Sequence, residues 1–372
     1  MSADLLSPRA LNRALLQRQG LLARSDRPAA EMIEQLVGMQ AQVPSNPYVA
    51  LWSRLDRFDP TELSGLIAGR QAVRAQLMRA TIHLVTARDC LALQPLTQPV
   101  LARTFKSQWG KQLGELEVDE VVAAGLELLA ERPRTRAELR ILLASGWPES
   151  DSSVMAYAVA FLNALVQVPP RGLWKASGQA TWAPAETWLG SRPDASLSPD
   201  SVILRYLGAF GPATVADIRT WSGFTGLREV VARLRTRLRT FRDEAGKELL
   251  DVLDAPLPDP ETPAPPRFLP EYDNVMLAHA ERSRILNGRG PGLPFPRGTW
   301  IGTLLVDGFY RANWSVSDDA GEARLIVDRL TRAPGDSAGV VDEIEAEGAG
   351  LLALIAPDAA RRSVRFAPTP RR

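Results

Sequence analysis

Two glutamines near the N-terminus have the type and spacing of a polar site. They are Gln40 and Gln42, in the stretch LVGMQAQVPSNPY at 36–48. The apolar periodicity predicts a helix over 28–41, in which Gln40 takes a position that the pattern reserves for an apolar side chain. Because Pro44 disfavours the helical conformation at the residue before it, the chain should extend from about residue 42. Residues two apart share a face of an extended chain, so both side chains can point into one space.

Two converging carboxamides can hold and orient a small polar molecule such as water. Each offers a carbonyl oxygen and an NH2 group, and neither can act as a Brønsted base at neutral pH. The alternative is that both amides only satisfy backbone groups at the end of a helix. The residues alone leave both interpretations open.

Composition narrows the class of protein. The chain has 372 residues, enough for two to four modules, and its 45% hydrophobic and 23% charged residues are typical of a globular protein. The net charge of +1 argues neither for nor against a nucleic-acid partner. One cysteine, Cys90, and two histidines, His83 and His279, predict neither a metal site nor a cofactor. Because we find no apolar run of about 18 residues and no secretory signal, we expect a cytoplasmic protein.

Two stretches of the chain repeat one pattern. TRAELRILLASG (135–146) and TVADIRTWSG (214–223) both begin Thr-x-x-acid, the capping box that starts a helix, and both end at glycine. Each has an amphipathic helix before it, another after it, and then a probable hairpin. The predicted flanking segments are 119–131, 152–166 and 166–184 for the first stretch, and 201–211, 225–238 and 239–253 for the second.

Three helices followed by a two-stranded wing is the winged-helix plan. The N-terminal part fits a looser version of it, so we predict three tandem units with a period near eighty residues. Its expected elements are helices at 8–20, 28–41, 47–57 and 60–69 and two strands within 72–85.

A proline-rich segment at 254–268 ends the repeats, and a strand-rich pattern follows it. The dipeptide Asp307–Gly308 between two strand-like runs predicts a hairpin over 299–316. Further strands at 322–330 and 362–368 and a helix at 340–355 indicate a small β-barrel or curled sheet. The expected division is 1–116, 117–195, 196–255 and 256–372.

The whole chain resembles the AlkZ/YcaQ family of winged-helix DNA glycosylases. The segments that carry the resemblance are LVGMQAQVPSNPYVALWSRL, LMRATIHLVTARD, GPATVADIRTWSG, LPEYDNVMLAHAERSRIL and LLVDGFYRANW. The resemblance implies an α+β fold of three tandem winged helices in a C-shaped arrangement with a C-terminal β-barrel. It also implies excision of N-alkylated purines from DNA. Gln40-Ala41-Gln42 is similar to the Gln-apolar-Gln motif of the AlkZ-like branch, which is associated with unhooking bulky or crosslinking N7-guanine adducts.

Two amides suit this implied chemistry. An N7-alkylguanine already carries a positive charge, so the departing base needs no general acid. Gln40 and Gln42 would then be the catalytic pair, which orients one water and stabilises the charge that develops at C1′. We therefore expect neutral damaged bases to be poor substrates. Since the motif contains no lysine to form a Schiff base, a monofunctional glycosylase is expected.

Other polar residues have a structural and a functional interpretation. His83 in the strand RATIHLV is either a half-buried histidine paired with a backbone carbonyl or a contact to the lesion or a phosphate. Asp273 is expected in an ion-pair latch between domains, whereas Arg282 and Arg284 could join it or face the DNA backbone. Of these and similar side chains, the candidate DNA- or lesion-contact residues are His83, Asn46, Arg79, Arg282, Arg284, Tyr310 and Arg311.

Two further groups are less specific. The arginines of the third unit, Arg233, Arg235, Arg237 and Arg239, form either a solvated helix face or a contact to DNA. The hairpin residues around Tyr310 either belong to the core or protrude to probe the minor groove.

Two function classes remain beside the enzyme. A non-catalytic winged-helix DNA-binding protein or regulator would read a specific sequence, and a packing scaffold would have lost DNA contact. A regulator usually dimerises and carries a basic stripe, whereas this chain is near neutral and shows no dimer helix. We therefore expect a monomeric enzyme that acts on double-stranded DNA carrying alkylated bases, associated with the nucleoid, with no membrane contact.

Overall fold

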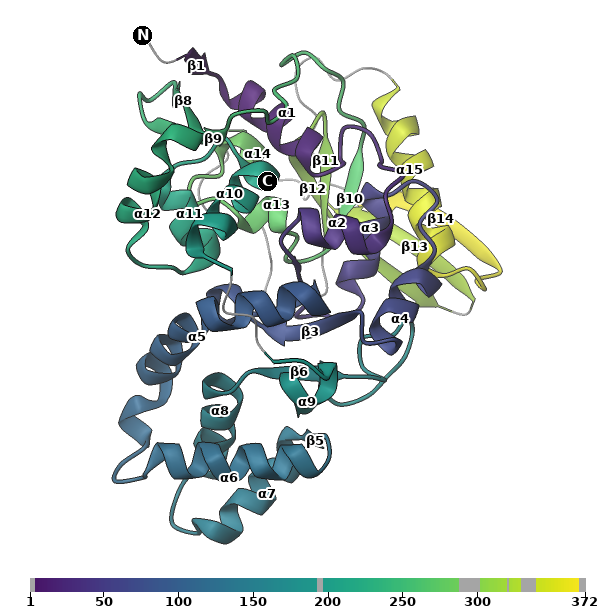
Figure 1. The fold of residues 1–372 in the computed structure, drawn as a ribbon. Coiled ribbons are helices and arrows are strands. Elements are labelled where there is room, and N and C mark those ends of the chain that lie inside the picture. Colours follow the sequence, from purple (N-terminus) through teal and green to yellow (C-terminus); the bar gives the residue numbers. More distant parts are fainter. Residues whose placement is uncertain (1–3, 193–196, 288–301, 320, 329–338, 368–372) are drawn as a thin grey trace, which may run out of the picture.

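The computed structural model describes residues 4–192, 197–287, 302–319, 321–328 and 339–367. It has a mixed α+β fold in three regions (Figure 1). Helices α6 to α8 form a lower lobe, helices α10 to α12 lie at the upper left, and the strands β10 to β14 lie at the upper right.

The first unit carries the two glutamines. Its predicted N-terminal helix at 28–41 is too long, because the helix ends at Gln35 and Gln40 lies in a strand. The two strands expected within 72–85 are confirmed, on either side of a 3-10 turn. The elements are α2 (Ala29–Gln35), β2 (Met39–Gln40), α3 (Asn46–Arg54), α4 (Pro60–Ala68), β3 (Ala72–Gln76), η1 (Met78–Ala80) and β4 (Ile82–Thr86).

The second unit repeats that order of elements. Its predicted capping box is confirmed: the Thr135 hydroxyl accepts from the Glu138 amide, and the Glu138 carboxylate accepts from the Thr135 amide. The elements are α6 (Val118–Glu131), β5 (Arg134–Thr135), α7 (Arg136–Gly146), α8 (Ser152–Leu162), β6 (Leu165–Val168), β7 (Thr181–Pro184) and α9 (Ala185–Leu189).

The third unit has the same order, with an isolated bridge between Ala213 and Leu250 in place of the short strand. Its capping box, Thr214 with Asp217, is also confirmed. The strand β1 (Asp4–Leu6) joins this unit, since it pairs in parallel with β8. The elements are α10 (Pro199–Phe210), α11 (Val215–Ser222), α12 (Leu227–Leu234), η3 (Arg235–Arg237), β8 (Leu238–Asp243) and β9 (Glu248–Val252), preceded in the chain by α1 (Pro8–Arg18).

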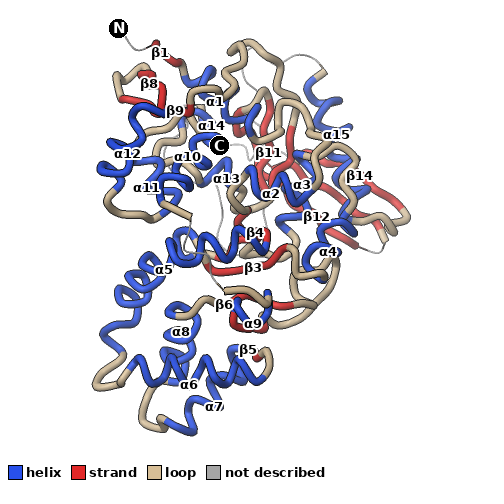
Figure 2. Tube along the Cα trace, in the orientation of Figure 1, coloured by secondary structure: helices blue, strands red, loops and turns tan. Residues whose placement is uncertain are grey.

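The strands of the first two units form one six-stranded sheet, in the order β2-β4-β3-β6-β7-β5. Strands β3 and β6 join the halves through Arg74 opposite Gln167 and Ala75 opposite Val166. Figure 2 shows these strands between the lower lobe and the rest of the molecule. The short strand that follows the first helix of each unit therefore occupies an outer edge of the same sheet.

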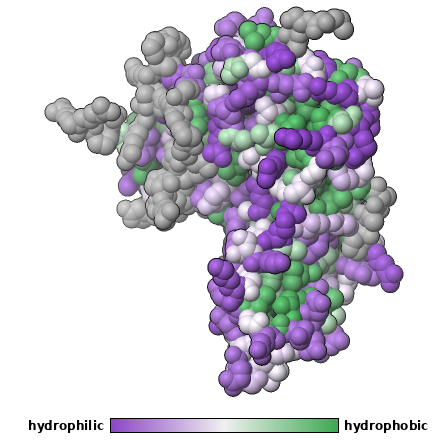
Figure 3. All heavy atoms as spheres, turned by 90° about the vertical axis from the view of Figure 1, so that its left-hand side faces the viewer, coloured by the Kyte–Doolittle hydropathy of each residue, from purple (hydrophilic) through white to green (hydrophobic). Residues whose placement is uncertain are grey.

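A long helix that the sequence did not predict connects the two units. It is α5 (Ala87–Trp109), capped by Thr86, and it contains Pro95 and Pro99. Its C-terminal end packs on α8, where Trp109 stacks on Tyr157 with ring centroids 4.4 Å apart. Figure 3 shows that the lower lobe carries a hydrophobic area bordered by hydrophilic side chains.

The C-terminal region is an open sheet and not a closed barrel among the described residues. Its order is β10-β11-β12-β13-β14, and the two outer strands do not pair with each other in this part of the chain. The Asp307–Gly308 turn is confirmed, while 299–301 of the predicted hairpin lie outside the described residues. The elements are β10 (Arg267–Leu269), α13 (Asn274–Leu277), α14 (Ser283–Leu286), β11 (Gly302–Val306), β12 (Phe309–Asp319), β13 (Glu322–Asp328), α15 (Val340–Ile355) and β14 (Arg361–Phe366).

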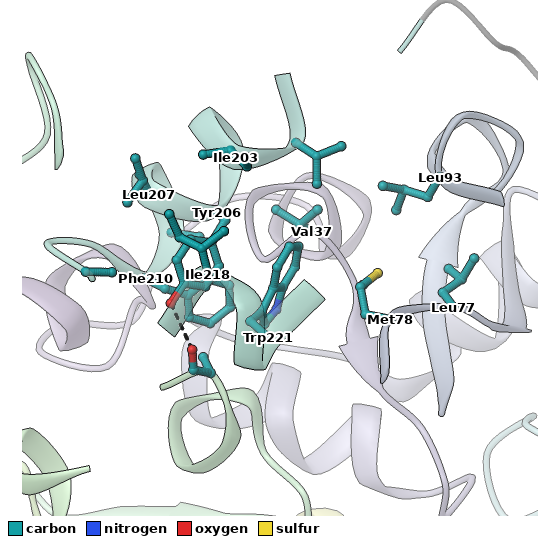
Figure 4. Close-up of a cluster of buried hydrophobic side chains, with 14 of the residues drawn as sticks. Val37, Leu77, Met78, Leu93, Ile203, Tyr206, Leu207, Phe210, Ile218 and Trp221 are labelled. Atoms are coloured by element: carbon teal, nitrogen blue, oxygen red, sulfur yellow. Dashed lines mark hydrogen bonds between the residues drawn. The ribbon is translucent and has the colours of Figure 1, made fainter. Parts of the chain in front are cut away.

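One hydrophobic core joins the third unit to the first. Figure 4 shows Tyr206, Phe210 and Trp221 of the third unit close to Val37 and Met78 of the first. The Tyr206 hydroxyl donates a hydrogen bond to the Ala278 carbonyl. Among the helices of the described residues, none combines the length and the apolarity needed to cross a membrane.

Candidate functional site

A strained turn at Val37 and Gly38 connects α2 to β2 and sets the direction of the strand. The amide of Val37 donates to the Glu34 carbonyl and the amide of Gly38 to the Ile33 carbonyl, the two bonds of a Schellman motif. Val37 has φ +53°, a conformation that is costly for a β-branched residue and that its burial in the core of Figure 4 maintains. Gly38 has φ +89°, and a Cβ there would lie 2.6 Å from the Val85 Cγ1. This turn explains why the helix ends before Gln40.

Both glutamines contact the turn between β3 and β4. In β2, Gln40 is opposite His83, and the Ala41 amide then donates to the Ile82 carbonyl. The Gln40 Oε1 accepts a hydrogen bond from Arg79 Nη2 at 2.7 Å, and the Gln42 Oε1 accepts one from the Ile82 amide at 2.7 Å. The two carboxamides therefore bind donors three residues apart, one in the turn and one at the start of β4. Gln40 is buried and Gln42 is exposed.

Arg79 connects the glutamine motif to the third unit. Its φ of +54° places it in the left-handed region, and its second guanidinium nitrogen donates to the Trp221 carbonyl at 2.9 Å. Burial lowers the pKa of Arg79 to about 10, so it stays charged at neutral pH. The predicted DNA contact is thus a half-buried cation that fixes the orientation of the Gln40 amide.

His83 is a buried neutral histidine. It lies 3.0 Å, through Nδ1, from the Thr81 carbonyl, a contact that favours the structural interpretation of this histidine. Burial, with a smaller contribution from Arg79, lowers the pKa of His83 to about 3. The side chain is fully buried and not half-buried, so this arrangement does not expose it to a lesion or a phosphate.

Arg74 is a site residue that the sequence analysis missed. It lies on β3, and its Nη2 donates to the carbonyl of Ala41, the residue between the glutamines, at 2.7 Å. Burial lowers the pKa of Arg74 to about 10. Asn46, at the start of α3, donates through Nδ2 to the Glu271 carbonyl at 2.6 Å and so ties the following turn to the C-terminal region.

The predicted latch at Asp273 is confirmed, with a partner that the sequence did not indicate. Asp273 forms a bidentate pair with Arg54 of α3 at 2.7 and 2.9 Å, and both side chains are 1% exposed. Arg54 also donates to the Gln19 Oε1 at 3.2 Å, and the Gln19 amide donates to the Ala209 carbonyl at 2.8 Å. A buried polar network therefore joins the first unit, the third unit and the C-terminal region.

The two arginines after Asp273 lie in different environments. Arg284 is buried and donates to the Pro212 carbonyl at 2.8 Å, so its guanidinium does not face solvent. Arg282 is half-buried, and burial lowers its pKa. Its Nε has no hydrogen-bond partner among the described residues. Of the pair, only Arg282 is partly exposed, so only its guanidinium is open to an anion.

The Asp307–Gly308 hairpin does not protrude. Arg9 and Arg13 of α1 form ion pairs with Asp307, and Asn12 donates to the Gly308 carbonyl at 2.8 Å. Of the two interpretations of this hairpin, the contacts of its tip with α1 favour the structural one. Beyond the turn, Arg311 is buried and Tyr310 packs against the core and donates to Asn313 at 3.2 Å, so a DNA contact by these two gains no support.

Most of the third-unit arginines are paired with acids. Arg233 binds Asp200 at 2.7 Å, Arg235 binds Glu248 at 2.5 Å, and Arg239 binds Asp251 at 2.9 Å. Arg237 is exposed. These pairs favour the structural interpretation of the cluster over groove reading.

A basic groove in the second unit was also missed by the sequence analysis. It has a volume of about 370 Å³ and is lined by Arg136, Arg140 and Arg171 beside Trp182. The described lining residues include no carboxylate, and the arginines bind the Tyr157 hydroxyl, the Ser152 hydroxyl and the Gly178 carbonyl. Sequence spacing could not reveal it, because the arginines come from α7 and from the loop between β6 and β7. Elsewhere, the described part of the chain has no group of three acidic, histidine or cysteine residues that could hold a metal ion.

Known proteins share this architecture. The sequence model of the family described as AlkZ-like, DNA glycosylase AlkZ-like, matches residues 33–354. A curated relative, the interstrand DNA cross-link repair glycosylase of Streptomyces sahachiroi, is 27% identical over 258 residues, which span 64% of this chain and 64% of the relative. The solved structure of the Streptomyces sahachiroi DNA glycosylase AlkZ has the same fold, with a TM-score of 0.74, 22% identity and coverage of 99% of this chain and 100% of that one. The chain therefore belongs to the AlkZ-like DNA glycosylase family.

Proposed function

We propose that the protein is a monofunctional DNA glycosylase that hydrolyses the N-glycosidic bond of N7-alkylated purines. The observation that carries the proposal is the pair of neutral carboxamides, Gln40 and Gln42, held on one turn, with Gln42 exposed. Bulky adducts and interstrand crosslinks are included among the substrates, because the curated relative is named for crosslink repair. The site of action is DNA in the cytoplasm.

The geometry suits the orientation of a water molecule. A carbonyl oxygen has two lone pairs, and each glutamine oxygen uses one of them, for Arg79 or for the Ile82 amide. The second lone pair of each oxygen remains for a water that attacks C1′ from the face opposite the base. Because both amides are fixed before substrate binds, little reorganisation is needed during the reaction.

The two carboxamides also determine which charge the damaged base must carry. A carboxamide cannot remove a proton from water at neutral pH, and no described carboxylate is hydrogen-bonded to either glutamine. The leaving group must therefore supply the driving force, as a cationic N7-alkylguanine or a comparable cationic purine does. Neutral damaged bases are released slowly in this mechanism.

The rest of the fold would serve DNA binding. We infer that each of the three units is a winged helix, since helix, short strand or bridge, helix, helix and two strands recur in each. The groove of Arg136, Arg140 and Arg171 is suited to phosphate oxygens, because none of these arginines is neutralised by an acid in its lining. Arg282 is a second candidate phosphate contact.

One experiment tests the proposal. The protein is incubated with duplexes that carry 7-methylguanine, 3-methyladenine, a bulky N7 crosslink or a neutral lesion, and abasic sites are measured by alkaline cleavage. We expect base release from the cationic lesions, little from the neutral one, and no borohydride-trapped covalent adduct. Absence of release from every cationic lesion would favour the non-catalytic DNA-binding protein, which a gel shift with undamaged sequences would then identify.

A further inference from the structure

A small cavity is lined by Gln40 of β2 together with residues of α3 and of the C-terminal region. It has a volume of about 10 Å³, and its polar lining consists of Gln40, Arg54, Asp273 and Asn274. That volume is on the scale of a single water molecule, which in a protein interior needs two to four polar partners. The cavity is therefore of the right size and polarity for one ordered water.

Two buried polar atoms lack a partner beside this cavity. Neither the Arg54 Nε nor the Asn274 Oδ1 has a hydrogen-bond partner among the residues that the structure describes, although Arg54 is 1% and Asn274 5% exposed. Leaving such groups unsatisfied is costly, and native proteins commonly satisfy them with internal water. One is a donor and the other an acceptor, so one water can satisfy both.

The orientation of the Asn274 amide is fixed. Its Nδ2 donates to the Gly38 carbonyl at 2.7 Å, and the flipped amide would bring two oxygens together. Asn274 therefore binds the strained turn before β2 through its Nδ2, and its Oδ1 remains available to accept a hydrogen bond in the cavity.

Gln40 offers a third partner. Its Oε1 is bound to Arg79 and, in the proposed mechanism, to the attacking water, so the group that remains for the cavity is its NH2. We propose that one buried water accepts hydrogen bonds from Arg54 and Gln40 and donates to Asn274, and that Asn274 is thereby a positioning residue for Gln40. Arg79 then holds one end of the Gln40 carboxamide, and the water holds the other. The catalytic part of this inference rests on the proposed glycosylase function.

A high-resolution crystal structure of the wild-type protein tests the water directly. We expect one well-ordered water within hydrogen-bond distance of the Arg54 Nε and the Asn274 Oδ1. A dry cavity overturns the proposal, whatever the behaviour of the variants. This readout does not depend on activity, so it decides the water even if the protein releases no base.

Asn274→Leu and Asn274→Ala test the positioning role. We expect the single-turnover rate of base release at saturating enzyme to fall about tenfold or more, with the Kd for DNA unchanged within about twofold. The matched control is Asn12→Leu: Asn12 is equally buried and donates to two backbone carbonyls, but it lies at the Asp307–Gly308 turn. Its loss should lower the melting temperature without changing the rate. Equal rate losses in both folded variants, or no loss for Asn274, would contradict the positioning role.

Discussion

The first and second units place different residues in the same structural slot. In each of these two units a short strand follows the first helix and pairs with the second strand of the hairpin: β2 with β4, and β5 with β7. In the second unit the slot holds Arg134 and Thr135, and Thr135 at once caps the next helix. In the first unit it holds Gln40, the last residue of β2, and Gln42 lies in the bend that follows.

The two slots differ in how far away in the sequence the partners of their polar groups lie. The polar groups of the second slot are satisfied within a few residues, by Glu131, the Leu128 carbonyl and Glu138. The first slot has no such local partners, and Gln40 depends on Arg79 of a distant turn and on a strained Val37–Gly38 corner. Departures of this kind are expected at functional sites, where stability is given up for geometry.

The largest expected effect is on stability, and it compares one ion pair near each slot: Arg54–Asp273 for the first unit and Arg134–Glu131 for the second. Asp273→Ala leaves the buried Arg54 cation without its partner and should lower the free energy of unfolding by about 3–5 kcal/mol. Glu131→Ala removes an exposed partner of Arg134 and should cost about 0–1 kcal/mol. Urea unfolding followed by tryptophan fluorescence measures both. Equal losses would show that the two slots are supported alike.

Local patterns of the sequence predicted much of this comparison. The capping boxes at Thr135 and Thr214 and the Asp307–Gly308 turn are confirmed, because each depends on residues within a few positions of one another. The predicted sharing of one face by Gln40 and Gln42 stays a prediction, although their carboxamides accept hydrogen bonds from residues only three positions apart.

Long-range contacts could not be predicted in the same way. The predicted helix at 28–41 is too long at its C-terminal end. Tertiary packing imposes the αL conformation at Val37, and the apolar periodicity of the sequence continues past this residue. The pairing of β3 with β6, the Arg54 partner of Asp273 and the contact from Arg79 to Gln40 all join residues far apart in sequence. The division into four domains stays a prediction.

A second effect concerns pH. In the register of the two slots, His83 occupies the place that Trp182 has in the second unit. Because burial lowers the pKa of His83 from its usual value of 6.5 to about 3, protons bind preferentially to the unfolded chain between these values. Its contribution to stability is therefore complete above pH 6.5 and is lost as the pH falls toward 3, with a slope approaching about 1.4 kcal/mol per pH unit.

His279 has the same direction of shift, to a pKa of about 3, so the two histidines should share the effect. Urea unfolding between pH 6.5 and 5 should show about half the pH slope in His83→Gln. Trp182→Phe is the control and should keep the full slope. An unchanged slope in His83→Gln would mean that the imidazole is not protected from protons in the native state.

The smallest expected effect is on DNA affinity, and it tests whether the second unit contacts phosphates. Replacing Arg136, Arg140 or Arg171 by Ala should weaken DNA binding a few-fold and reduce the salt dependence of log Kd by about one counterion each. Arg132→Ala, which removes a cation already paired with Glu138, should leave the slope unchanged. Fluorescence anisotropy at several salt concentrations measures this. Identical slopes for all four variants would exclude the groove as a phosphate contact.

The most direct measurement is the rate of base release by variants of the glutamine motif, compared with a variant of the second slot. Gln40→Ala and Gln42→Ala should still fold and bind a 7-methylguanine duplex, but their single-turnover release of the base should fall about 100-fold, the scale seen when one preorganised polar group is removed from an active site. Thr135→Ala in the second slot should keep the wild-type rate. Full release by both glutamine variants would contradict the account.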